Sequence, residues 1–125
     1  MTLLFDENFS DRTVAALVAL GHKVRHAEDG PGRGSADTEV FTFARVNAFY
    51  FVTKDARIRR RRHEQETMRQ AGIGVFVFKS TVPRGLDQET AFVLQVVGKI
   101  EEVIASDRPP FVYEVTDKRE VRRLE

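Results

Sequence analysis

The chain of 125 residues contains no cysteine. Disulfide bonds, thiolate zinc sites and cysteine nucleophiles are therefore excluded. No apolar run approaches the ~20 residues that a membrane-spanning helix needs, and the N-terminus lacks the basic-then-apolar pattern of a secretory leader. We therefore expect a cytoplasmic protein with no membrane segment.

A strong excess of charge of one sign is also missing, because the formal net charge is only +1. The protein as a whole is not a polycation, so any affinity for nucleic acid has to come from local patches. The length suits one domain, which we place over residues 1–125, with a charged C-terminal tail at residues 118–125.

Short apolar segments alternate with amphipathic ones along the chain. Ser10 is predicted to cap the first helix, and Gly21 and Gly72 are predicted to end the first and third helices. We expect strands near residues 3–5, 22–27, 48–53, 74–79 and 111–115, and helices near residues 11–20, 37–47, 57–71 and 88–106.

Strands that alternate with helices predict an α/β protein. We expect a three-layer α/β/α sandwich whose central sheet is mostly parallel, because the strands at residues 3–5, 48–53 and 74–79 are almost entirely apolar. The segment at 111–115 alternates more between apolar and polar residues. It is a candidate edge strand, and an antiparallel orientation is open to it.

Acidic residues follow two of the expected strands. Asp6 follows the first strand, Asp55 follows the third, and Asp37 begins the helix after a glycine-rich loop. Ligands of open α/β sheets gather beyond the carboxyl ends of the strands, so we expect the three aspartates to line one crevice. Clustered carboxylates repel one another unless a cation or proton lies between them. Their oxygens suit Mg²⁺ or Mn²⁺, ions that activate water for attack on phosphodiesters.

Each acid also has a structural interpretation. Asp6 is a candidate helix cap or acceptor of a backbone hydrogen bond, and Asp37 and Asp55 are candidate caps of the helices that follow them. Glu39 competes with Asp37, but residues two apart do not share a helix face. We rank Asp37 first and keep Glu39 as an additional ligand. Glu7 is expected to point away from Asp6.

A dense group of arginines follows Asp55. One interpretation is a solvated helix face, balanced by Glu64 and Glu66 at helical spacing. The other is contact with the phosphate backbone of RNA beside the acidic site. The group comprises Arg57, Arg59, Arg60, Arg61 and Arg62.

Four segments occur in a familiar order: LLFDENFS, LGHKV, GRGSADTEV and FVTKDARI. Together they resemble the PIN-like nuclease family, particularly its small bacterial toxin-like branch. The resemblance implies a compact α/β sandwich with an acidic site for Mg²⁺ or Mn²⁺, and cleavage of RNA by metal-activated water. It also implies the toxin half of a toxin–antitoxin pair that is neutralised by a DNA-binding antitoxin, and it suggests a homodimer.

Carried over by position, the resemblance implies that Asp6, Asp37 and Asp55 are the catalytic, metal-binding acids. Asn8 matches the asparagine of the D-E-N motif, which positions a water or caps the helix. Thr53 precedes the third acid and is predicted to orient that carboxylate by a hydrogen bond. The chain departs from the pattern at Arg57, where many relatives carry a further acid, so the resemblance does not supply a fourth metal ligand at this position.

Two other functions compete with this hypothesis. The first is a degenerate PIN-like module that binds RNA or a protein without cutting it. The second is a receiver-like domain, which also places acids at strand ends and a lysine after a later strand, here Lys79. The T-x-D ending at Thr53–Asp55 and the long glycine loop fit a receiver poorly.

Overall fold

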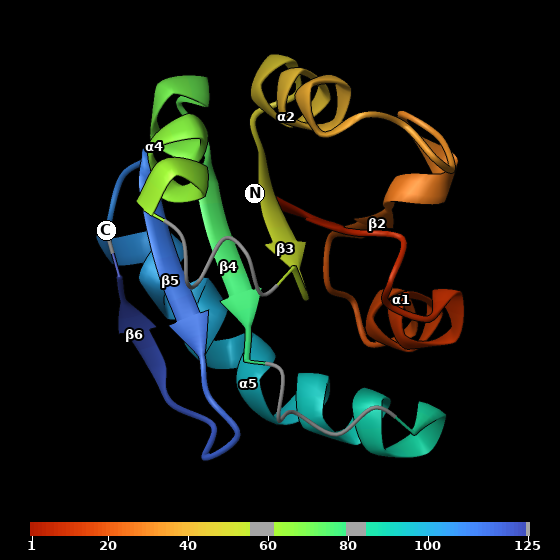
Figure 1. Ribbon diagram of the computed structural model, residues 1–125. Coiled ribbons are helices and arrows are strands. Elements are labelled where there is room, and N and C mark those ends of the chain that lie inside the picture. The colour runs from red at the N-terminus through yellow and green to blue at the C-terminus, as the bar shows by residue number, and fades with distance from the viewer. Residues whose placement is uncertain (56–61, 80–84, 125) are drawn as a thin grey trace.

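The computed structural model describes residues 1–55, 62–79 and 85–124 (Figure 1). The helices are α1 (Asp11–Ala19), α2 (Asp37–Val46), α4 (Arg62–Ala71) and α5 (Leu86–Ser106), with the short 3₁₀ helix η1 (Ala27–Asp29). The strands are β1 (Thr2–Phe5), β2 (Val24–His26), β3 (Phe49–Thr53), β4 (Gly74–Phe78), β5 (Phe111–Val115) and β6 (Val121–Arg123). The predictions for Arg57, Arg59, Arg60 and Arg61 lie outside the described residues, whereas Arg62 begins α4 and is exposed.

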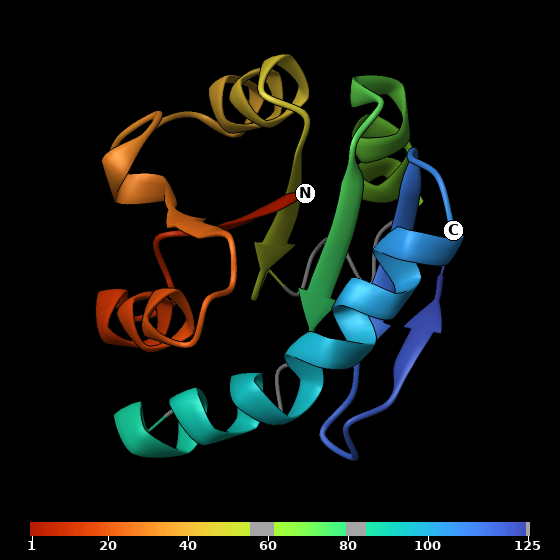
Figure 2. The same ribbon diagram turned by 180° about the vertical axis from the view of Figure 1, so that it is seen from behind.

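The strands form one sheet in the order β2-β1-β3-β4-β5-β6. All neighbouring strands are parallel except β5 and β6. Helix α4 lies in front of the sheet in Figure 1 and α5 lies in front of it in Figure 2, so the two cover opposite faces. These layers confirm the predicted α/β fold with a mostly parallel sheet.

The C-terminal end of the chain corrects two predictions. Strand β5 lies inside the sheet, parallel to β4, and the edge is formed by β6 within the segment predicted to be a charged tail. Pairing with β5 holds β6 in place, and Arg122 Nη2 lies 2.7 Å from Glu114 Oε1 across the pair. An edge strand needs only one apolar face, and here Val121 alone supplies it.

Local signals explain the helix ends. Ser10 caps α1 as predicted, because its Oγ accepts a hydrogen bond from the Arg12 backbone N–H at 3.1 Å. Gly21 follows the helix with φ +90°, a left-handed conformation that favours glycine. No helix within residues 1–55, 62–79 and 85–124 combines the length and apolarity needed to cross a bilayer.

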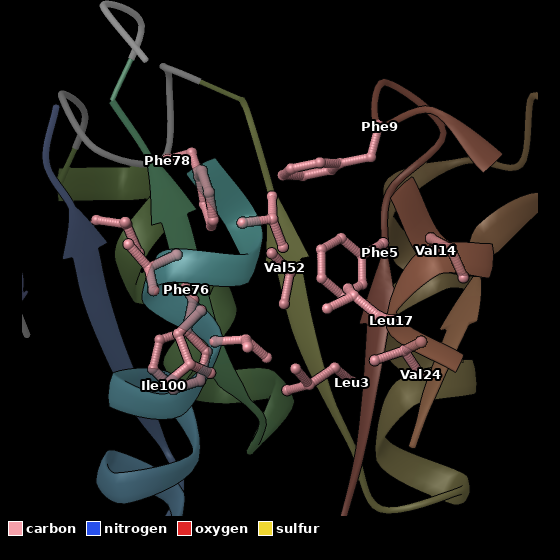
Figure 3. Close-up of a cluster of buried hydrophobic side chains, with 14 of the residues drawn as sticks. Leu3, Phe5, Phe9, Val14, Leu17, Val24, Val52, Phe76, Phe78 and Ile100 are labelled. Carbon is pink, nitrogen blue, oxygen red and sulfur yellow. The ribbon is translucent and has the colours of Figure 1, made fainter. Parts of the chain in front are cut away.

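Two buried cores cover the two faces of the sheet. Leu3 and Phe5 of β1 point into the core under α1 and α5, which Figure 3 shows, while Leu4 points into the core under α2 and α4. This alternation buries β1 on both faces, as expected for a central parallel strand. Phe9 belongs to the first core and packs edge-to-face on Phe5 at 4.9 Å and on Phe78 at 5.2 Å.

The strand order also locates the crevice of the sheet. The connection from β1 leads to β2 on one side, while β3 lies on the other side of β1. Such a reversal opens a crevice beyond the carboxyl ends of the two strands. Asp6 directly follows β1, and Asp55 lies just beyond Thr53 at the end of β3. The fold therefore places both acids at the reversal point.

Candidate functional site

A cavity of about 230 Å³ lies at the reversal point and is lined by all three predicted aspartates. We call it the acid pocket. It is closed on its apolar side by residues of β3, α2 and α4. Its lining includes Asp6, Asp37 and Asp55, the polar residues Glu7, Asn8 and Thr53, and the apolar residues Val40, Phe41, Phe51 and Met68.

Asp6 is held firmly within this pocket, where it is only 8 % exposed. Its Oδ2 accepts a hydrogen bond from Thr53 Oγ1 at 2.5 Å and another from the Lys54 backbone N–H at 3.1 Å. Its Oδ1 accepts one from the Asn8 N–H at 3.1 Å. Asp6 therefore accepts backbone hydrogen bonds, as one interpretation of the sequence held, but it does not cap α1, whose cap is Ser10.

Burial raises the pKa of Asp6 above its ordinary value of 3.8. The hydrogen bonds from Thr53, Lys54 and Asn8 lower the pKa, but they compensate for burial only in part. A carboxylate in this state is stabilised when a proton or a cation comes close. The electrostatics of Asp6 therefore suit a cation-binding group.

Thr53 acts on a different acid from the one predicted. Its hydroxyl donates to Asp6, and its Oγ1 accepts a hydrogen bond from the Asp55 backbone N–H at 3.0 Å. Thr53 thus orients the first carboxylate directly and the third acid through its main chain. The reason is the register of β1 and β3, which pairs Phe5 with Val52 and so brings Asp6 beside Thr53.

Asp37 and Asp55 approach the pocket from α2 and from beyond β3. Asp37 is exposed and is the first residue of α2, whose N-cap is Ala36 with no side-chain cap bond. The interpretation of Asp37 as an N-cap is therefore wrong. Asp55 is partly buried, and its role as a cap for a following helix stays a prediction because residues 56–61 lie outside the described part.

The two remaining acids of this region, Glu7 and Glu39, lie in different places. Glu7 is among the residues that line the acid pocket, and its Oε2 accepts a hydrogen bond from the Gly34 N–H at 2.9 Å. Gly34 has φ +74°, so this part of the glycine-rich loop depends on a residue without a side chain. Glu39 is exposed in a separate surface depression beside Phe43 and is absent from the lining of the acid pocket.

Asn8 contributes to the site through its main chain. Its N–H fixes Asp6, and its carbonyl oxygen accepts a hydrogen bond from Lys54 Nζ at 3.3 Å. The next residue, Phe9, has its carbonyl oxygen 2.7 Å from His26 Nε2, while His26 Nδ1 accepts the Glu28 N–H at 3.1 Å. Because an amide N–H can only donate, this pattern assigns the His26 ring proton to Nε2. This hydrogen bond joins Phe9, the residue after the D-E-N segment, to His26 at the start of η1.

Sequence reasoning missed two residues beside the pocket, Lys54 and Glu89. Lys54 Nζ forms an ion pair with the Glu89 carboxylate and lies 4.6 Å from the centre of the Phe9 ring. Glu89 comes from the first turn of α5 and is only 4 % exposed. It lies three and four positions before Phe92 and Val93, which belong to the buried face of α5. A charged residue on a buried helix face signals a buried partner, but the sequence does not say which one.

Glu89 also differs from Asp6 in its electrostatics. Burial alone would raise the pKa of Glu89, but hydrogen bonds from Lys54, Thr13 and the Ser10 N–H lower it below its ordinary value. Glu89 is therefore a fully paired carboxylate, whereas Asp6 is a carboxylate whose charge is only partly compensated. Of Asp6 and Glu89, only Asp6 is suited to attract a further cation.

Residues 1–80 match a family model described as a PIN like domain. The match covers more than half of the chain, so the protein belongs to the PIN-like domain family, which has a nuclease-type fold. Neither a curated protein nor a solved structure gives a match. The family membership argues against a receiver domain, as does Lys79, which is not among the residues that line the acid pocket.

PIN domains typically use metal ions. Within the described ranges, no three or more His, Asp or Glu side chains form a ready-made group of metal ligands. This arrangement still fits Mg²⁺, which proteins usually hold through one or two carboxylates while waters and substrate phosphates complete the shell. Asp6, Asp37 and Asp55 line the same pocket and are the residues that would hold such an ion.

Proposed function

We propose that the protein is a metal-dependent endoribonuclease and the toxin of a bacterial toxin–antitoxin system, acting in the cytoplasm. The observation that carries the proposal is the convergence of Asp6, Asp37 and Asp55 on one pocket at the reversal point of a PIN-like sheet. The partly compensated charge of Asp6 supports a cation there. The family resemblance supplies RNA as the substrate.

The chemistry is hydrolysis of a phosphodiester, in which water attacks phosphorus and the bond to one sugar oxygen breaks. Bound Mg²⁺ or Mn²⁺ would supply an activated water and would stabilise negative charge on the phosphate. Asp6 and its two companion aspartates would hold the ion, and Thr53 and the Lys54 N–H keep Asp6 oriented. The arginines after Asp55 would contact RNA phosphates.

The first test is cleavage of a labelled RNA by the purified protein with Mg²⁺, with Mn²⁺ and with EDTA. We expect cleavage only with metal, and we expect Asp6→Asn and Asp55→Asn to lower the rate by at least the roughly 100-fold that loss of an outer-shell partner costs at other metal sites. Glu102→Gln, an exposed acid near the end of α5, is the matched control. Full activity in both aspartate variants would rule out this site.

The three aspartates line one pocket, but no three acidic or histidine side chains among the described residues lie close enough together to hold a metal ion, and this favours a second candidate function. In that case the protein is a PIN-like module that binds RNA without cutting it. Binding would then survive Asp6→Asn and Asp55→Asn. It would weaken as salt rises, and more so when Arg59, Arg60, Arg61 and Arg62 are replaced by glutamine. Metal-dependent cleavage by the wild-type protein would exclude this alternative.

The proposed partners are a DNA-binding antitoxin and a second copy of the chain. Expression in a bacterial host should arrest growth, and Asp6→Asn should abolish the arrest without lowering the amount of protein. Co-expression of the neighbouring reading frame should restore growth if that frame encodes the antitoxin. Normal growth with abundant wild-type protein would contradict the toxin role. Sedimentation of the purified chain would determine whether it dimerises.

A further inference from the structure

We propose that Glu89 is a positioning residue for the acid pocket. Acting through Lys54, it holds the end of β3, with Thr53 and Asp55, in place beside Asp6. The mechanical part of this proposal stands on contacts within the chain. Its consequence, tighter binding of a divalent cation, rests on the proposed function.

Lys54 occupies the central place in this arrangement. Its backbone N–H donates to Asp6 Oδ2 at 3.1 Å, and its chain neighbours are Thr53, which also donates to Asp6, and Asp55. A shift of the Lys54 main chain would therefore disturb one hydrogen bond to Asp6 and displace the residues on either side. The position of two pocket acids depends on one residue that does not itself line the pocket.

The Lys54 side chain is fixed on three sides. Glu89 binds its ammonium group, the Asn8 carbonyl oxygen lies 3.3 Å away, and the Phe9 ring lies beneath it at 4.6 Å. The side chain is only 20 % exposed. A lysine normally keeps its charged end in water, so this placement depends on an anion that compensates for burial. Glu89 is that anion.

Glu89 is itself held by a helix other than its own. Its Oε1 accepts hydrogen bonds from the Ser10 N–H at 3.0 Å and from Thr13 Oγ1 at 2.6 Å, both at the start of α1. One carboxylate thus joins α1, α5 and the segment after β3. Because α1, α5 and the sheet share one buried core, this contact ties Lys54 to that core.

A direct role as a metal ligand does not fit Glu89. Its oxygens already take hydrogen bonds from Lys54, Ser10 and Thr13, and these bonds lower its pKa. It is absent from the lining of the acid pocket and faces a neighbouring polar cleft, which shares only Glu7 and Asn8 with the pocket. Its influence on the pocket therefore passes through Lys54.

The decisive variant is Glu89→Gln. Glutamine keeps an oxygen for the Ser10 N–H and the Thr13 hydroxyl, but it replaces the oxygen that faces Lys54 by an amide group that cannot accept its protons. The matched control is Glu114→Gln. Glu114 is likewise buried, at 3 % exposure, and pairs with Arg122 across β5 and β6, away from the pocket.

The first measurement is amide hydrogen exchange by NMR at Lys54 and Asp55, with Phe76 of β4 as an internal reference for global stability. We expect exchange at both amides to become roughly 10-fold faster in Glu89→Gln, because local opening is easier when the anchor is lost. In Glu114→Gln the ratio to Phe76 should not change. Unchanged exchange in Glu89→Gln would overturn the positioning role.

The second measurement is the Kd for Mn²⁺ by calorimetry. Loss of an outer-shell partner weakens metal binding by about 10- to 100-fold at other sites, so we expect roughly 10-fold for Glu89→Gln and no change for Glu114→Gln. Lys54→Met should weaken binding as much as Glu89→Gln, and the double variant should be no weaker than either, because the pair acts as a unit. Lys54→Arg keeps the pair and should retain the wild-type Kd.

The two measurements separate the two claims. Should wild-type protein fail to bind Mn²⁺, the proposed function fails, while the exchange rates still decide the role of Glu89. Should Mn²⁺ bind equally to wild type and Glu89→Gln, the effect on metal affinity is refuted. If Glu89→Gln does not fold, both measurements are made on Lys54→Met. This variant removes the same ion pair by changing its less buried member.

Discussion

At the level of single residues, Asp6 carries a buried charge that Thr53, Lys54 and Asn8 compensate only in part. Its pKa in the folded protein therefore lies above the ordinary value of 3.8. Between pH 3.8 and the raised pKa of Asp6 in the folded protein, the folded state binds more protons than the unfolded state. The contribution of Asp6 to stability is present below this range and is lost as the pH rises through it.

This sign gives a prediction for Asp6→Asn in the metal-free protein. The free energy of unfolding of wild type, relative to the variant, should fall as the pH rises above 3.8 and then level off. Urea titrations at a series of pH values measure this difference. Asp117→Asn, an exposed acid in the turn between β5 and β6, controls for the general effect of removing one charge. A difference that rises with pH would contradict the assignment.

The positions of Asp6, Asp37 and Asp55 could be predicted from the sequence, because each follows a strand or begins a helix at one edge of an α/β sheet. The partner of Thr53 could not be predicted, since it depends on the register of two strands far apart in the chain. The pairing of Glu89 with Lys54 could not be predicted for a similar reason, because the two residues lie far apart in the chain. Nothing near Glu89 in the sequence shows that α5 begins beside Lys54.

At the level of elements, the rings of Tyr50 from β3 and Phe111 from β5 pack closely against Gly74 of β4. A Cβ added there would lie 2.6 Å from Phe111 Cζ and 2.7 Å from Tyr50 Cδ1, and these two rings stack on each other. Gly74→Ala should therefore destabilise the protein by about 1–3 kcal/mol through overpacking. Chemical denaturation measures the loss.

Gly98 in α5 provides a control with the opposite sign. A Cβ at Gly98 meets no atom within 4 Å, so Gly98→Ala should stabilise the protein by about 0.5–1 kcal/mol through helix propensity. If both variants were stabilised, the close contact at Gly74 would be refuted.

Some strands could be predicted from the sequence and one could not. β1, β3 and β4 lie between two layers of helices, so their apolar runs identified them. β6 contains one apolar residue, Val121, between charged neighbours, and it exists only because β5 offers an edge. The prediction that β5 is an edge strand was wrong for this reason, because its neighbour β6 was not predicted as a strand.

At the level of the whole molecule, a bound cation should stabilise the folded state by mass action. Mn²⁺ at 100 times its Kd would raise the free energy of unfolding by about 2.7 kcal/mol. For a chain of this size that corresponds to a rise in Tm of roughly 10 °C. Thermal unfolding should show the rise in wild type and in Glu102→Gln, but not in Asp6→Asn. An equal rise in Asp6→Asn would place the ion elsewhere.

The contact between Lys54 and Glu89 has a consequence for the time at which the site is completed. Residues 1–80 match the family and contain every aspartate of the acid pocket, whereas Glu89 lies beyond them. Synthesis proceeds from the N-terminus, and a nascent chain can fold only from what has already emerged. When β1 to β4 have emerged from the ribosome, all three aspartates are outside it, but the carboxylate that fixes Lys54 is not. The pocket therefore reaches its final geometry only when α5 has left the ribosome.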